Sequence, residues 1–90
     1  MNTTVRDLRR EPRRIADGDV LVWFRNPQRL EIQGRLVDLS PSGFRMTHQF
    51  TGLPAGQVVE FSHPEAVGRA RVIWNRITDA RVETGFLVLA

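Results

Sequence analysis

Apolar and polar residues alternate along most of the chain. In residues 19–25, for example, Val20, Val22 and Phe24 occupy every second position, with Trp23 on the opposite side. A period of two places alternate side chains on the same face of a β-strand. No stretch of ten or more residues carries the apolar spacing of an amphipathic helix. The pattern predicts six strands, at residues 19–25, 30–39, 44–50, 57–62, 69–77 and 81–90.

Turn-forming residues separate these segments. Asn, Pro and Gly recur in "NPQ" at 26–28, "SPSG" at 40–43 and "TGLPAG" at 51–56. Short strands at regular spacing with such turns between them are typical of a small barrel or sandwich. Residues 1–17 have few apolar side chains, and Pro12 interrupts any helix there. We therefore expect one all-β domain at 18–90, preceded by a flexible arginine-rich arm at 1–17.

The alternation also assigns side chains to faces. Leu36 and Asp38 continue the face begun by the apolar residues at 30 and 32, and Arg45 lies opposite the apolar face of its own strand. We expect His48 on a strand surface or at a strand end, and His63 in a solvated loop at 63–68. Neither histidine is assigned a function.

The charge is concentrated at the N-terminus. All 13 basic residues are arginine, and the formal net charge is +3. Residues 1–14 carry five arginines against two acids, whereas residues 15–90 carry eight arginines and eight acids. The first 14 residues thus hold the entire net charge. Such a segment attracts anions, and the planar guanidinium suits phosphates and guanine edges.

Several classes of function find no support. The chain has no cysteine and two distant histidines, so we expect no metal site and no disulfide. "SPSG" lacks the Gly-x-Ser-x-Gly pattern of a nucleophile elbow, and no glycine-rich phosphate loop opens a helix. We expect no catalysis and no cofactor. With no long apolar run and no leader-like start, we expect a cytoplasmic protein without membrane insertion.

Two features remain, the arginines of "RREPRR" and the turn "DLSPSG". Their chemistry is complementary. Arginine donors match guanine O6 and N7 and also phosphate oxygens, whereas a carboxylate accepts from guanine N1–H and N2–H₂. Asp38 and Ser40, two residues apart, would lie on the same side of a strand end, and Gly43 would allow close approach of a flat ligand. A guanine nucleotide fits both features.

The order Arg-x-x-x-Arg, then Asp-x-Ser-x-x-Gly, resembles the PilZ domain, a bacterial receptor module for cyclic di-GMP. The similarity extends over nearly the whole chain, through "GRLVDLSPSGFRM", "LPAGQVVEFS", "ARVIWNR" and "TGFLVL". It implies a six-stranded antiparallel β-barrel whose N-terminal arm closes over the ligand. Many members continue past the last strand into a C-terminal helix, whereas we expect the residues up to Ala90 to form a strand.

The resemblance carries over to specific positions. Both Arg9 with Arg13 and Arg10 with Arg14 satisfy the arginine spacing. We favour the first pair, because proline at position 12 precedes its second arginine; that choice implies one ligand per chain. In the second motif the family pattern assigns nucleotide contacts to Asp38, Ser40 and Gly43. Trp74 matches an aromatic residue near the ligand in some members, and packing in the barrel wall explains it equally well.

The resulting hypothesis is a non-catalytic receptor that binds cyclic di-GMP and signals to an unidentified effector protein through ordering of its arm. We expect a monomer or weak dimer that binds no nucleic acid. One alternative is a barrel that binds single-stranded nucleic acid through its arginines and Trp23 or Trp74. Another is an interaction module that needs no ligand. Asp38 disfavours the nucleic-acid alternative, because a carboxylate repels the phosphate backbone.

Overall fold

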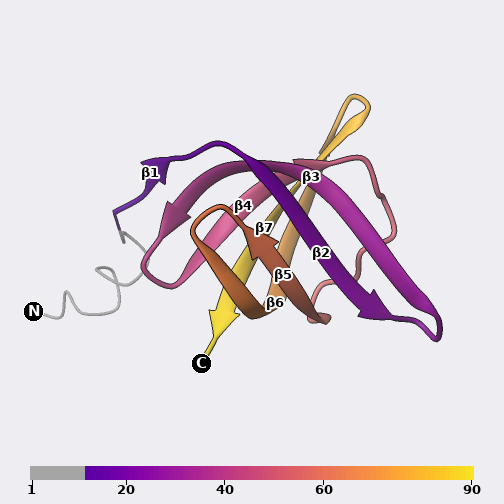
Figure 1. Ribbon diagram of the computed structural model, residues 1–90. Helices are drawn as coiled ribbons and strands as arrows, with labels where there is room; N and C mark the ends of the chain where they lie inside the picture. Colours follow the sequence, from indigo (N-terminus) through magenta and orange to yellow (C-terminus); the bar gives the residue numbers. More distant parts are fainter. Residues whose placement is uncertain (1–11) are drawn as a thin grey trace, which may run out of the picture.

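The computed structural model describes residues 12–90, and the regular secondary structure in this range is all β-strand (Figure 1). The predicted all-β class is confirmed. The strands are β1 (Arg14–Ile15), β2 (Asp19–Arg25), β3 (Arg29–Ser40), β4 (Gly43–His48), β5 (Val58–His63), β6 (Ala66–Thr78) and β7 (Arg81–Leu89). No helix long and apolar enough to cross a membrane is present in this part of the chain.

Strands β2 to β7 close into a six-stranded antiparallel barrel, as predicted. The sheet runs β3-β2-β5-β6-β7-β4, and β4 pairs again with β3 to complete the ring. The short strand β1 is an addition to this ring. It pairs with β3 at Leu39 and Asp38, beyond the residues of β3 that pair with β2. The segment just after Pro12 is therefore held against the barrel at the end of β3.

The core includes inward residues that the alternation predicts in the first strands, together with Leu53 from the 49–57 loop. Val20, Val22 and Phe24 of β2 are buried, as are Phe44 and Met46 of β4. The Phe44 ring stacks on Phe86 at 4.7 Å between centroids and lies 4.8 Å from Phe61. The contacts join β4 to β7 and β5, so one aromatic cluster fills one end of the barrel.

One expectation about β3 is wrong. Leu36 pairs with Met46, but Asp38 pairs with Arg45, so Val37 is an extra residue in β3. Such a β-bulge reverses the alternation. Leu36 therefore faces the core with Met46, whereas Asp38 shares the outer face of the barrel with Arg45. Local alternation had placed Asp38 on the same face as Leu36.

The expectation for His63 is also wrong, whereas His48 is the last residue of β4 and so lies at a strand end, as expected. His48 is 4% exposed and His63 is 8% exposed. The predicted loop at 63–68 is shorter than expected, because β5 extends to His63 and β6 begins at Ala66. The His63 ring stacks on Phe61 at 5.2 Å and meets Phe44 edge-on at 5.0 Å. It belongs to the aromatic cluster instead of a solvated loop.

Candidate functional site

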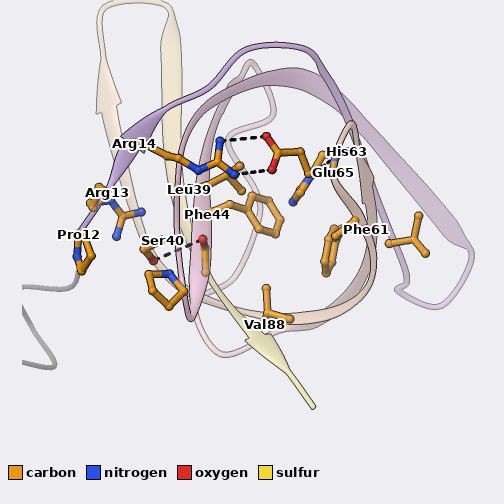
Figure 2. Close-up of a pocket in the computed structure, with 14 residues that line it drawn as sticks. Pro12, Arg13, Arg14, Leu39, Ser40, Phe44, Phe61, His63, Glu65 and Val88 are labelled. Atoms are coloured by element: carbon orange, nitrogen blue, oxygen red, sulfur yellow. Dashed lines mark hydrogen bonds and ion pairs between the residues drawn. The ribbon is translucent and has the colours of Figure 1, made fainter.

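A pocket of about 550 Å³ opens at the end of the barrel next to β1 (Figure 2). The floor is apolar and includes the rings of Phe44, Phe61 and His63. Residues from both sequence motifs line its rim: Arg13, Arg14, Ser40, Pro41 and Gly43. The fold therefore brings the two motifs to the same end of the barrel.

The outer face beside this pocket carries a row of residues that crosses five strands. The row is defined by successive pairings from β1 to β6: Ile15, Asp38, Arg45, Gly85 and Trp74. Directly paired residues on neighbouring strands share a face, so these five positions lie on one surface, with Gly85 leaving a gap between the side chains of Arg45 and Trp74. We call this set the outer row.

Asp38 is the centre of the charge arrangement. Arg45 donates from Nε to both carboxylate oxygens, at 3.0 and 2.9 Å, and also from Nη2 to Oδ2. Arg13 donates from Nη2 to Oδ1 at 2.9 Å, across 25 residues of sequence. Burial alone would raise the pKa of Asp38, but the hydrogen bonds from Arg45 and Arg13 outweigh it and lower the pKa to about 2. Asp38 is therefore a buried, ionised acceptor.

Trp74 lies at the other end of the outer row. Its indole occupies the space directly over Gly85, where a Cβ atom would clash with the ring. The residue is 36% exposed, so the indole is partly open to solvent. Asp38 and Trp74 are separated by three strand spacings, or about 14 Å. Because the indole lies over Gly85, one strand nearer to Asp38, the gap between the two side chains is shorter than this backbone separation.

Arg14 points the other way, across the mouth of the pocket. Its guanidinium makes two hydrogen bonds to Glu65 in the β5–β6 turn, one of 3.1 Å from Nη1 and a second from Nη2 (Figure 2). The hydrogen bond from Arg14 is the largest cause of the lowered pKa of Glu65. This ion pair connects residues 51 positions apart in the sequence.

Ser40 and Gly43 have roles within the turn itself. Ser40 Oγ donates to the Gly43 carbonyl oxygen at 3.4 Å. A Cβ atom at Gly43 would clash with the carbonyl oxygen of Phe86 in β7. The close approach of β7 thus accounts for this glycine without a ligand, although both residues also line the pocket.

The residues proposed from the sequence fall into three groups. Arg13, Arg14, Ser40 and Gly43 line the pocket, and Asp38 lies behind it in contact with Arg13. Trp74 is not part of the pocket lining and shares the outer row with Asp38. Arg9 and Arg10 lie outside the described residues.

Two further charged residues complete the site. The alternation correctly predicted that Arg45 lies on the opposite face from the apolar residues of β4. Its contact with Asp38 could not be predicted, because that contact depends on the bulge at Val37. Glu65 carried no signal in the sequence, because its partner Arg14 is distant and the turn that holds it was expected to be longer. Within residues 12–90 no group of His, Cys, Asp or Glu side chains is arranged to hold a metal ion.

No protein-family model matches the chain, and a search of curated proteins finds no match to it.

Proposed function

We propose that the protein is a cytoplasmic, non-catalytic receptor for cyclic di-GMP, of the PilZ type. The observation that carries the proposal is the hydrogen bond between Arg13 and Asp38. It joins the arginine motif to the Asp-x-Ser-x-x-Gly motif, so that donors for phosphate and an acceptor for guanine lie side by side. Cyclic di-GMP carries both of these chemical groups.

Binding would exchange partners on Asp38. Arg13 contributes a single hydrogen bond to Oδ1, and its side chain is 40% exposed, so it can leave at little cost. Guanine N1–H and N2–H₂ would then donate to the carboxylate, which Arg45 continues to hold by Oδ2. The released Arg13 guanidinium would be free to pair with a phosphate oxygen or with guanine O6 and N7.

The outer row offers a surface for the flat base. Gly85 has no side chain between Arg45 and Trp74, and the indole lies over it. A purine held at its edge by Asp38 would lie along this surface towards Trp74, where stacking on the indole adds to affinity. Movement of Arg13 and the segment around it would alter the surface presented to an effector protein.

Calorimetric titration of the purified chain tests the proposal. We expect affinity in the micromolar range or tighter for cyclic di-GMP, and at least about tenfold weaker binding of GTP, cyclic AMP and a short single-stranded oligonucleotide. No heat and no thermal stabilisation with cyclic di-GMP would reject the proposal. Preference for the oligonucleotide would favour a nucleic-acid-binding barrel instead.

A matched pair of variants tests the residue that reads the base. Asp38→Asn keeps the shape but removes the charge, and should weaken cyclic di-GMP binding by about tenfold or more. Asp19→Asn makes the same change at an exposed carboxylate that pairs with Arg35 at 2.7 Å. It should leave affinity unchanged. Equal losses in both variants would show that Asp38 has no specific role.

A further inference from the structure

The pocket floor is not explained by nucleotide binding. Asp38, Arg45 and Trp74 all belong to the outer row, whereas the floor of the pocket faces the barrel interior. The volume of about 550 Å³ is within the roughly 300–1,000 Å³ of small-molecule sites. An apolar cavity of this size with a few polar groups at one edge is the usual form of such a site.

The walls would contact an apolar body. Phe44, Phe61 and His63 form the floor, and Val88 and Val67 are on the wall. Val67 is 75% exposed and Val88 is 39% exposed, so both present apolar surface at the opening. His63 is neutral, because burial lowers its pKa and its Nδ1 accepts a hydrogen bond from the Glu65 amide at 3.1 Å. The imidazole therefore acts here as an aromatic surface.

The charges at the rim favour an anion. The charged residues that line the pocket are Arg13, Arg14 and Glu65, and Arg13 is paired with Asp38 behind the lining, so Arg14 is the guanidinium that a ligand can reach by exchange with Glu65. Glu65 already shows where a carboxylate binds, because the Arg14 guanidinium holds it with two hydrogen bonds above the apolar floor. Both side chains of the pair are well exposed, at 64% and 45%. Exposed ion pairs contribute little to stability, so another carboxylate can replace Glu65.

We infer that the barrel-end pocket is a second binding site, for an amphiphilic anion with an acyl or aromatic body and one carboxylate. The body lies against the aromatic floor beside Val88, and the carboxylate takes the place of Glu65 on Arg14. This site is separate from the outer row, and the inference holds whether or not the chain binds a cyclic dinucleotide.

Titration with decanoate in the absence of any nucleotide tests this inference, with decanol as the neutral ligand of equal chain length. Displacement of an anilinonaphthalene sulfonate dye gives a second readout. Decanoate should bind at least about tenfold more tightly than decanol, the scale of hydrogen bonds to a charged group. Equal binding of the two would overturn the assignment of an anion, and no binding of either would overturn the site.

Adjacent residues of β7 provide a matched control for location. Val88 lines the pocket and pairs with the buried Ala70, whereas Leu87 pairs with Arg71 on the outer face. Their exposures are nearly equal, at 39% and 40%. Val88→Glu should therefore abolish decanoate binding, and Leu87→Glu should leave it unchanged. Equal effects would place the ligand elsewhere.

The exchange at Arg14 has its own test. Glu65→Gln removes the competing carboxylate and should increase decanoate affinity several-fold without affecting decanol. Arg14→Gln should reduce decanoate affinity towards that of decanol. Circular dichroism and thermal unfolding of each variant establish that the barrel remains folded. Unchanged decanoate affinity in both folded variants would overturn the role of the ion pair.

Discussion

Asp38 combines burial with full ionisation because two arginines from different segments meet on its carboxylate. Arg45 comes from the paired position of β4, and Arg13 comes from the residue before β1. A carboxylate with 7% side-chain exposure would be costly without such partners. The same arrangement makes Asp38 a preformed acceptor, since its position does not depend on a ligand.

The ionisation of Asp38 should be visible in the pH dependence of stability. A pKa of about 2 against the usual 3.8 corresponds to roughly 2 kcal/mol of stabilisation by the charged form. Because the folded pKa is the lower one, this contribution is complete above about pH 4 and is lost as the pH falls towards 2. Carbon-13 NMR titration of the carboxyl group measures the pKa directly.

Urea unfolding of variants checks the same contribution. Asp38→Asn should lower the free energy of unfolding at pH 7 by about 2 kcal/mol. The change should make little difference at pH 2. Asp79→Asn, in the exposed β6–β7 turn, serves as the control and should change stability little. A loss in Asp38→Asn that persists at pH 2 would argue for a packing effect.

At the level of elements, two glycines allow neighbouring strands to pack closely, because a Cβ atom at either position would clash with the adjacent strand. Gly43 begins β4 where the carbonyl oxygen of Phe86 comes close, and Gly85 lies under the Trp74 indole. These contacts join β4 to β7 and β7 to β6, next to the bulges at Val37 and Ile73. The strands that carry the outer row are therefore positioned by close backbone packing.

Alanine at Gly43 should be poorly tolerated. Its Cβ would clash with the backbone oxygen of Phe86, which cannot move without disturbing the β4–β7 pairing. We expect Gly43→Ala to lower the free energy of unfolding by about 2 kcal/mol or more. At Gly68, by contrast, the nearest atom to an added Cβ is Phe61 Cε1 at 3.5 Å, an ordinary contact. Differential scanning calorimetry should therefore show a clear loss in Gly43→Ala and little change in Gly68→Ala.

Across the whole molecule, a chain of polar side chains ties the 49–57 loop to the barrel. His48 Nε2 donates to Thr84 Oγ1 at 2.7 Å, and Thr84 Oγ1 donates to Asn75 Oδ1 at 2.6 Å. Asn75 Nδ2 then donates to the Leu53 carbonyl oxygen at 2.7 Å. His48 Nδ1 accepts from the Phe50 amide, so the imidazole is neutral. Protonation would place a second hydrogen against that amide.

Stability should therefore fall on mild acidification. Burial lowers the pKa of His48 and also of His63. Below about pH 6.5 the unfolded chain takes up protons that the folded protein does not, so the free energy of unfolding decreases. The slope is up to about 1.4 kcal/mol per pH unit for each histidine. Urea unfolding between pH 7.5 and 5 measures this slope. The pH range is well above the one in which Asp38 titrates.

The variant His48→Gln separates the two histidines. It removes one of the two groups and should reduce the slope by about half, although the variant starts from lower stability. A slope equal to that of the unaltered chain would mean that His48 does not contribute to the pH dependence.

The sequence determined the all-β class and most of the core, because side-chain alternation and turn chemistry act over a few residues. Val20, Val22 and Phe24 face the core as their spacing predicts, and the turn at 40–43 occurs where Pro41 and Gly43 are found. Such local signals also identified Arg13 and Asp38 as complementary, although without showing that they touch.

Tertiary packing decided the geometry of the site. A single extra residue at Val37 moved Asp38 to the outer face and onto Arg45, and a bulge depends on how neighbouring strands pair. Closure of the barrel brought Glu65 to Arg14 across 51 residues and buried His63 against Phe61. These contacts join strands far apart in the sequence, so alternation along one strand cannot reveal them. The closed barrel must fill its interior, which buries His63, and must pair the buried charge of Asp38, whereas the exposed Arg14–Glu65 pair follows from the position of the β5–β6 turn beside β1.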